Sequence, residues 1–269
     1  MCGIAGYSVS PDSTVERKLA AQALLAGIAE RGADAVGYAW RADRGAIDVT
    51  KLRGGASALL DEIVLPHSAH QALIHVRDFT KGHPEIEANN HPIRHGAVVG
   101  IHNGVIENDD ALLAHYGIDR QEREMTVDSE AIFALVEHHR HDVRSLSQLR
   151  GAMAAAWMDE RDAATLYLAR GRLRPLWVGR SRHELYFAST RRALTIVEAA
   201  LQTRLQVHEV REGRLLRVAE GRIVRERRFR PDRRYREDGY LSPVRAPREA
   251  VSCLERLAVL TSAPAASTT

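Results

Sequence analysis

Two series of short apolar segments, each bounded by turn residues, restrict the fold of this chain more than any other feature. Runs of this length between turn residues are typical of buried β-strands. The second series starts at residue 151 and continues as consecutive short strands to about Phe229. These strands are too numerous for one sheet with a face in water, so we predict two stacked sheets. The first series comprises residues 2–10, 36–42, 46–54, 71–79 and 96–104.

Segments with a helical spacing of apolar residues separate the strands and would cover the two sheets. The first of them is residues 15–32, where Ser13 and Glu16 fit a capping box. Together the elements predict one α+β domain. The other predicted helices are residues 57–65, 109–117, 128–140, 191–201 and 247–260.

The overall composition is that of a globular protein. The chain has 269 residues, of which 45% are hydrophobic and 27% charged. No apolar run approaches the roughly 20 residues that span a bilayer, and no basic and apolar leader precedes Cys2. We therefore expect a cytoplasmic protein with no membrane association, in which Cys2 and Cys253 are free thiols.

Two clusters of ionisable residues could suggest binding of nucleic acid or of a metal ion, but neither has the pattern that such binding needs. The arginine-rich segment 211–238 alternates charges with apolar residues, which is typical of the solvated face of strands. Nucleic-acid binding is therefore not expected. His138, His139 and His141 share no spacing with an acid or a cysteine, so no metal site is expected either.

Cys2 directly follows the initiator Met1. Removal of Met1, which is usual before a small side chain, would leave Cys2 with a free α-amino group. Because the pKa of such an amine lies near 7.7–8.0, it can act as a base for the neighbouring thiol. Attack of the thiol on an amide forms an oxyanion, which needs preorganised hydrogen-bond donors.

Residues suited to the remaining roles lie at the ends of predicted strands and at the start of a helix. Asn103 and Gly104 end one strand, and an amide side chain next to a glycine N–H can form an oxyanion hole. Arg77 and Thr80 follow another strand, and Asp128 begins a helix. An arginine and an aspartate are the groups that an amino-acid substrate needs for its carboxylate and its ammonium. Taken singly, each residue also has a plainer interpretation as a turn, a surface charge or a helix cap.

These residues fall within an ordered series of motifs: MCGIAGY, RGADAVGYA, HVRDFTKG, ANNHP, HNGVIEN and VDSEAI. The series resembles that of the class II glutamine amidotransferase domains, which are N-terminal-nucleophile glutaminases. The resemblance covers about residues 2–225. It implies the four-layer αββα sandwich of the N-terminal-nucleophile hydrolases.

The resemblance also implies four catalytic residues. Cys2 would be the nucleophile and form a γ-glutamyl thioester, with its own α-amino group as the base. Arg31 would orient Cys2. Asn103 and the N–H of Gly104 would form the oxyanion hole.

The substrate-binding residues implied by the resemblance are four, one of them shared with the catalytic set. Arg77, helped by Thr80, would bind the glutamine α-carboxylate. Asp128 would bind the α-ammonium, with the Gly104 carbonyl as a second acceptor. The chain departs from the family pattern in this loop, where Lys81 follows the sequence RDFT in place of the common Arg-Trp/Tyr-Ala/Ser-Thr.

The sequence predicts a glutaminase domain over residues 2–229, a C-terminal extension with a helix over 230–260, and a disordered tail over 261–269. About 40 residues after the first domain are too few for an acceptor-binding domain. The predicted function is therefore a glutaminase subunit that needs no cofactor. It would hydrolyse glutamine and supply the ammonia to a separate synthase.

Two alternative functions stay open, as does assembly into a homo-oligomer. The chain could hydrolyse another γ-glutamyl compound, as the unusual RDFTK sequence suggests. The relatives that do so tend to have an arginine after the catalytic cysteine, where this chain has Gly3. The second alternative is a non-catalytic binding protein on the same fold.

Overall fold

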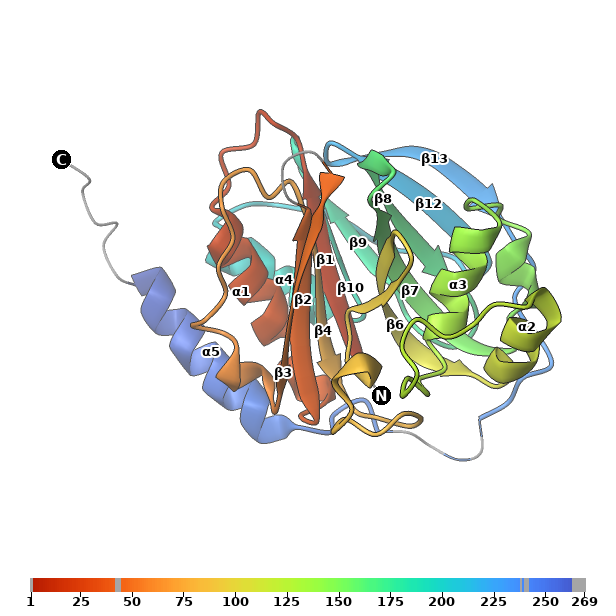
Figure 1. Cartoon of the computed structure of the whole chain (residues 1–269). Helices are drawn as coiled ribbons and strands as arrows, with labels where there is room; N and C mark the ends of the chain where they lie inside the picture. Colours follow the sequence, from red (N-terminus) through yellow and green to blue (C-terminus); the bar gives the residue numbers. More distant parts are fainter. Residues whose placement is uncertain (1, 42–44, 238, 240–241, 263–269) are drawn as a thin grey trace.

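Two antiparallel sheets lie face to face with helices on their outer sides (Figure 1). The computed structural model describes residues 2–41, 45–237, 239 and 242–262. The first sheet has the order β11-β9-β10-β1-β4-β2-β3 and the second the order β13-β12-β8-β7-β6-β5. The strands of the first sheet are β1 (Gly3–Val9), β2 (Ala35–Arg41), β3 (Ile47–Arg53), β4 (Gln71–Arg77), β9 (Trp177–Arg180), β10 (Glu184–Ala188) and β11 (Gln206–Glu209). Those of the second are β5 (Ile93–His95), β6 (Val98–Ile106), β7 (Gly151–Asp159), β8 (Asp162–Arg170), β12 (Arg214–Ala219) and β13 (Arg222–Arg228).

The helices form the two outer layers. Helices α1 (Arg17–Ile28) and α4 (Arg191–Ala200) pack on the first sheet, and α5 (Pro247–Ser262) packs on α1. Helix α3 (Glu130–His138) packs on the second sheet and α2 (Asp109–Tyr116) packs against α3. This arrangement confirms the predicted four-layer αββα sandwich.

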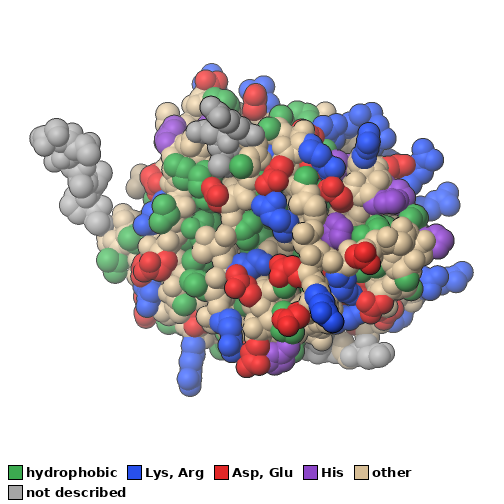
Figure 2. Space-filling model, viewed as in Figure 1, with side chains coloured by type: hydrophobic (Ala, Val, Ile, Leu, Met, Phe, Trp, Pro, Cys, Tyr) green, Lys and Arg blue, Asp and Glu red, His purple; other side chains and the backbone are tan. Residues whose placement is uncertain are grey.

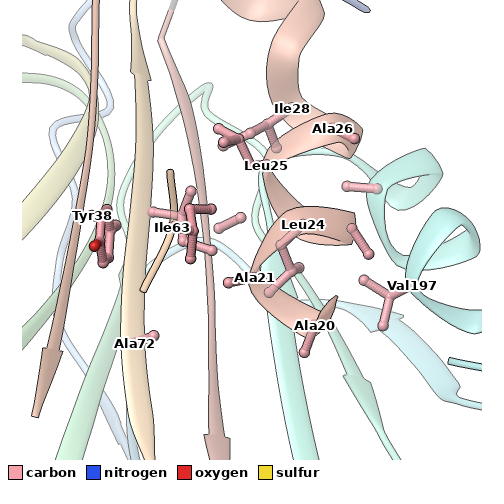
Figure 3. Close-up of a cluster of buried hydrophobic side chains, with 14 of the residues drawn as sticks. Ala20, Ala21, Leu24, Leu25, Ala26, Ile28, Tyr38, Ile63, Ala72 and Val197 are labelled. Carbon is pink, nitrogen blue, oxygen red and sulfur yellow. The ribbon is translucent and has the colours of Figure 1, made fainter. Parts of the chain in front are cut away.

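Strand β1 shows why the central strands are buried at every position and are mostly apolar. Successive side chains of a strand point to opposite faces. Ile4 therefore enters the core between the sheets, while Ala5 and Tyr7 enter the core beneath α1. Figure 3 shows that second core, in which Leu24 of α1 and Val197 of α4 lie near each other. A strand that is buried on both faces has no polar alternation.

The prediction of a helix over residues 57–65 is wrong. The structure has a single 3₁₀ turn at Ala56–Ala58, followed by further turns. Leu60 and Ile63 are nevertheless fully buried in the core beneath α1. The apolar side chains of this segment are therefore buried although the backbone forms a loop. Their spacing alone does not distinguish a buried loop from a helix.

The predicted capping box at the start of α1 is also wrong. Glu16 is itself the N-cap, and its carboxylate accepts hydrogen bonds from the N–H groups of Lys18 and Leu19. The Ser13 hydroxyl instead donates to Glu184 of β10. A hydrogen bond to a residue far away in the sequence thus replaces the helix cap that the local pattern predicted.

The C-terminal helix begins at Pro247, where the sequence predicts it, and ends at Ser262. Its last two residues therefore fall within the segment predicted to be disordered, and there the prediction is wrong. Residues 263–269 lie outside the described part of the chain. Cys253 and Leu257 are buried against α1 and anchor α5 there.

The arginine-rich segment forms strands β12 and β13, and most residues of β13 are exposed. Arg214 pairs with Glu226 at 2.9 Å, and Arg217 pairs with Asp162 at 3.2 Å. Figure 2 shows acidic and basic side chains interspersed over the face that it displays. No helix in the described ranges is long and apolar enough to cross a membrane.

Candidate active site

Cys2 lies at the start of the central strand β1. Because Gly3 pairs with Val76 of β4, Cys2 faces the residues that follow β4. Its Sγ lies 3.4 Å from the carbonyl oxygen of Asp78, to which the thiol donates. Arg31 Nε donates to the carbonyl oxygen of Cys2 at 3.4 Å.

The chemistry of the half-buried thiol follows from these surroundings. Burial raises the pKa of Cys2 above its ordinary value, while the charge of Arg77 opposes that shift. The thiol is therefore protonated at neutral pH. To become a nucleophile, it has to give its proton to a neighbouring base.

A cavity of about 120 Å³ opens beside Cys2. Four of the predicted site residues line it, although they come from three separate parts of the sequence: Cys2, Thr80, Asn103 and Gly104. The remaining lining residues are Asp78, Phe79, Val105, Arg174, Ser242 and Arg245. The structure thus assembles a nucleophile and an amide–glycine pair around one small space.

Asn103 is the unusual member of this group. Its side chain on β6 is fully buried, yet neither its amide nitrogen nor its amide oxygen has a hydrogen-bond partner among the described residues. Buried polar groups are nearly always hydrogen-bonded, because an unpaired one costs about 1–3 kcal/mol. An unpaired amide that lines a cavity is therefore available to a ligand in that cavity.

Gly104 occupies a conformation that a side chain cannot share. Its φ is +150°, and a Cβ atom there would lie 1.9 Å from the carbonyl oxygen of Ala152 on β7. Its backbone can therefore face the cavity only because the residue is glycine.

Replacing Gly104 by alanine is expected to lower the free energy of unfolding by roughly 3 kcal/mol or more, since backbone strain and a steric clash add together. Gly117 is the matched control, because its φ is also positive, at 63°, but a Cβ atom there would have no neighbour within 4 Å. Gly117→Ala should cost only about 1–2 kcal/mol, the cost of the left-handed backbone alone. Chemical denaturation of both variants checks this, and equal losses would refute the clash.

Arg77 lies near Cys2 but does not line the cavity. It is buried at the end of β4, and its guanidinium donates to Asn90 Oδ1, to the carbonyl oxygen of Lys81 at 3.0 Å and to that of Gly82. These bonds hold the loop after β4 in place. The structure therefore shows Arg77 as an organiser of the loop that carries Thr80.

Asp128 is likewise buried close to the cavity without lining it. Its Oδ2 accepts a hydrogen bond of 2.6 Å from the N–H of Ile106, two residues after Gly104. Burial raises the pKa of Asp128 to about 6, and the nearby carboxylate of Asp109 adds to the shift. Its charge therefore changes within an accessible pH range.

Lys81 does not add a free positive charge to the site. Its ammonium lies 2.6 Å from Asp109 Oδ2 and 3.0 Å from Asp110 Oδ2, at the start of α2. These two carboxylates neutralise it. The departure from the family pattern at this position is thus matched by acidic partners on α2.

The predicted site omitted six residues of the cavity wall, and four of these six are polar or charged: Asp78, Arg174, Ser242 and Arg245. Arg174 pairs with Glu237, 63 residues away, and Arg245 pairs with Asp78, 167 residues away. No local pattern marks such partners. Within the described ranges, no group of three or more His, Cys, Asp or Glu side chains is arranged to hold a metal ion.

A cysteine at the start of a central strand of an αββα sandwich, facing an amide and a glycine, defines the class of N-terminal-nucleophile hydrolases. Solved structures agree with this assignment of the fold. The glutamine phosphoribosylpyrophosphate amidotransferase of Bacillus subtilis superposes with a TM-score of 0.66 at 21% identity, over 84% of this chain and 49% of that chain. A structure described as the allosteric regulatory enzyme of purine biosynthesis gives a TM-score of 0.68 at 22% identity, with the same coverage.

Sequence comparisons identify the family. Residues 75–196 match the model of a glutamine amidotransferase domain. The chain is also similar to glutamine–fructose-6-phosphate aminotransferases (isomerizing). It is 32% identical to that of Escherichia coli K12 over 208 residues, which are 72% of this chain and 32% of the relative. It is 34% identical to that of Geobacillus kaustophilus over 192 residues, which are 66% of this chain and 30% of the relative.

The chain therefore carries a class II glutamine amidotransferase domain, which confirms the predicted family. It spans about a third of the length of these curated relatives.

Proposed function

We propose that this chain hydrolyses the side-chain amide of glutamine through a γ-glutamyl thioester on Cys2, once Met1 has been removed. One observation carries the proposal: Cys2 shares a single cavity with Gly104 and with the Asn103 amide, which has no partner among the described residues. An acyl-transfer reaction needs this combination, because it joins a nucleophile to donors that stabilise an oxyanion.

The proposed reaction starts with transfer of the thiol proton of Cys2 to its own α-amino group. The thiolate attacks the amide carbon, and the resulting oxyanion accepts hydrogen bonds from the Asn103 amide and the Gly104 N–H. The amine then returns the proton to the leaving nitrogen, so that ammonia departs and the thioester remains. Water, deprotonated by the same amine, then attacks the thioester carbon. The carbon–sulfur bond breaks, the amine returns the proton to the departing thiolate of Cys2, and glutamate is released.

The substrate's polar ends are assigned to the residues beside the cavity. Arg77 and Thr80 would hold the α-carboxylate, and Asp128 with the Gly104 carbonyl would hold the α-ammonium. Burial of Arg77 and Asp128 supports this assignment, since charges of low exposure bind more strongly than solvated ones.

Glutamine binding should weaken at acid pH because of Asp128. Below about pH 6 its carboxyl becomes protonated and loses its attraction for an ammonium group. In a Cys2→Ala variant, which binds without turnover, we expect the dissociation constant to rise about tenfold per pH unit below 6. Calorimetric titration from pH 4.5 to 8 checks this. Adding Asp128→Asn should remove the pH dependence, whereas adding Asp119→Asn, at an exposed position, should leave it intact.

The ammonia acceptor is proposed to bind elsewhere, on a separate synthase. The cavity of about 120 Å³ supports this, because pockets for drug-sized ligands occupy roughly 300–1,000 Å³. The site has room for a glutamine side chain and not for a second substrate beside it.

Intact-protein mass spectrometry before and after 6-diazo-5-oxo-norleucine tests the proposed function. We expect a mass without Met1 that rises by one adduct on Cys2, together with release of glutamate from glutamine. Glutamine should be the fastest substrate in a panel of γ-glutamyl compounds. Absence of both the adduct and glutamate release, with Met1 removed, would contradict the proposal.

A further inference from the structure

The C-terminal extension reaches the cavity that holds Cys2. We name its described residues Glu237, Gly239 and 242–246 the C-terminal strap. The strap follows β13 of the second sheet and leads into α5, which packs on α1 on the opposite side of the molecule (Figure 1). Both ends of the strap are therefore attached to the body of the protein.

The α5 end of the strap is held by several groups. Glu30 accepts hydrogen bonds on its carbonyl oxygen from the N–H groups of Arg245 at 2.8 Å and Ala246 at 2.9 Å. Glu249 Oε2 accepts from the N–H of Ser57 at 2.8 Å. These bonds, together with the buried face of α5, place Arg245 at the cavity.

Arg245 contacts both segments that hold Cys2. Its backbone is bonded to Glu30, the neighbour of Arg31, whose Nε donates to the Cys2 carbonyl. Its guanidinium pairs with the Asp78 carboxylate at 3.2 Å, and the carbonyl of the same Asp78 accepts the Cys2 thiol. The nucleophile is therefore enclosed by two backbone segments that a single strap residue joins.

Glu237 supplies the counter-charge on the other wall. Arg174 lines the cavity together with Asn103 and Gly104 and is only 2% exposed. It pairs with Glu237, while its Nε has no partner among the described residues. A buried cation needs a paired acid to stay in place, and here that acid comes from the strap.

We infer that the C-terminal strap is the outer wall of the glutamine pocket, and that Glu237 and Arg245 are positioning residues for the reaction. Glu237 sets Arg174 beside the oxyanion hole, and Arg245 sets Asp78 against Cys2. This inference rests on the proposed function and extends its site to the region beyond residue 229. The strap residues act through Arg174 and Asp78 and take part in no bond that forms or breaks.

The two ion pairs should affect different steps. Glu237→Gln removes the acid that holds Arg174 in place, so the guanidinium should leave its position beside the oxyanion hole and kcat should fall about tenfold or more. Arg245→Ala releases the Asp78 loop before substrate binds, so KM should rise up to about fivefold, the limit for a half-exposed pair. Arg245→Lys should restore KM to within about twofold, because it keeps the charge on the same backbone.

The experiment measures kcat and KM for glutamine hydrolysis, and the rate of 6-diazo-5-oxo-norleucine addition to Cys2, in the full-length chain. Arg248→Ala is the matched control, since it removes an exposed arginine of α5 three residues from Arg245. Melting temperatures identify any variant that loses its fold. Should Glu237→Gln not fold, the comparison of Arg245→Ala with Arg245→Lys decides alone.

Normal parameters for the strap variants, in an active wild type, would overturn the inference and leave the proposed function standing. The inference is supported if KM increases in Arg245→Ala and returns close to the wild-type value in Arg245→Lys. A merely structural loss would not be restored by a positive charge at this position. A wild type that neither hydrolyses glutamine nor takes up the label overturns the proposed function, and the inference with it. The two failures are thus distinguishable.

Discussion

Replacing Cys2 by alanine is expected to lower glutamine hydrolysis by about 10⁴-fold or more and to abolish the adduct with 6-diazo-5-oxo-norleucine. No other described thiol lines the cavity, and the remaining cysteine, Cys253, lies on α5 and is buried against α1. Without the thiol no thioester forms, and the oxyanion donors have no intermediate to stabilise. A coupled glutamate assay and intact-mass analysis measure the two losses.

Cys253→Ala is the control for this prediction. Burial raises the pKa of Cys253 to about 12, so its thiol is unreactive at neutral pH. The variant should keep its activity within about twofold and still take up one label, with a stability loss of about 1 kcal/mol from the small cavity left behind. Labelling of Cys2→Ala, or loss of labelling in Cys253→Ala, would contradict the prediction, because the reactive thiol would then be Cys253.

Replacing Asn103 by alanine should separate activity from stability. Loss of an oxyanion donor lowers kcat by about 10²–10³-fold, with little change in KM. The buried Asn103 amide has no partner among the described residues, so its removal leaves no other group unsatisfied. We therefore expect the free energy of unfolding to stay within about 1 kcal/mol of wild type or to rise. Steady-state kinetics and urea denaturation of one preparation measure both.

Asn108→Ala should show the opposite pattern. Its side chain donates to the Gln148 carbonyl at 3.0 Å and accepts from the Arg150 N–H at 2.8 Å, and it lies outside the cavity. Removing it should lower the free energy of unfolding by about 1–3 kcal/mol and leave kcat within about twofold. If Asn103→Ala instead lost stability and kept its kcat, the amide would be a structural group and the oxyanion hole would have to lie elsewhere.

The motifs of the sequence predicted the part of the site that local chain geometry creates. Asn103 and Gly104 are adjacent on one strand, so their shared position at the cavity follows from the strand itself. Cys2 was predictable because an N-terminal thiol carries its own base. The roles assigned to Arg77 and Asp128 remain predictions, since the structure places both beside the cavity and not in its wall.

Local patterns were less reliable where several packing solutions satisfy the same residues. The segment 57–65 buries its apolar side chains in turns and not in a helix, because the core beneath α1 accepts either. Ser13 is a second example, because its hydroxyl donates to Glu184 of β10 and does not cap α1. In both cases a tertiary contact outweighed a weak local preference.

The sequence by itself determined the fold class, the family and the group formed by Cys2, Asn103 and Gly104, since these depend on strand periodicity and on motifs only a few residues long. Only the tertiary structure decided which charges complete the pocket. The chain has 38 lysines and arginines and 35 aspartates and glutamates, and no spacing distinguishes the pair of Arg174 with Glu237 or of Arg245 with Asp78. An ion pair depends on distance in space, and the path of the C-terminal strap back to Cys2 sets that distance.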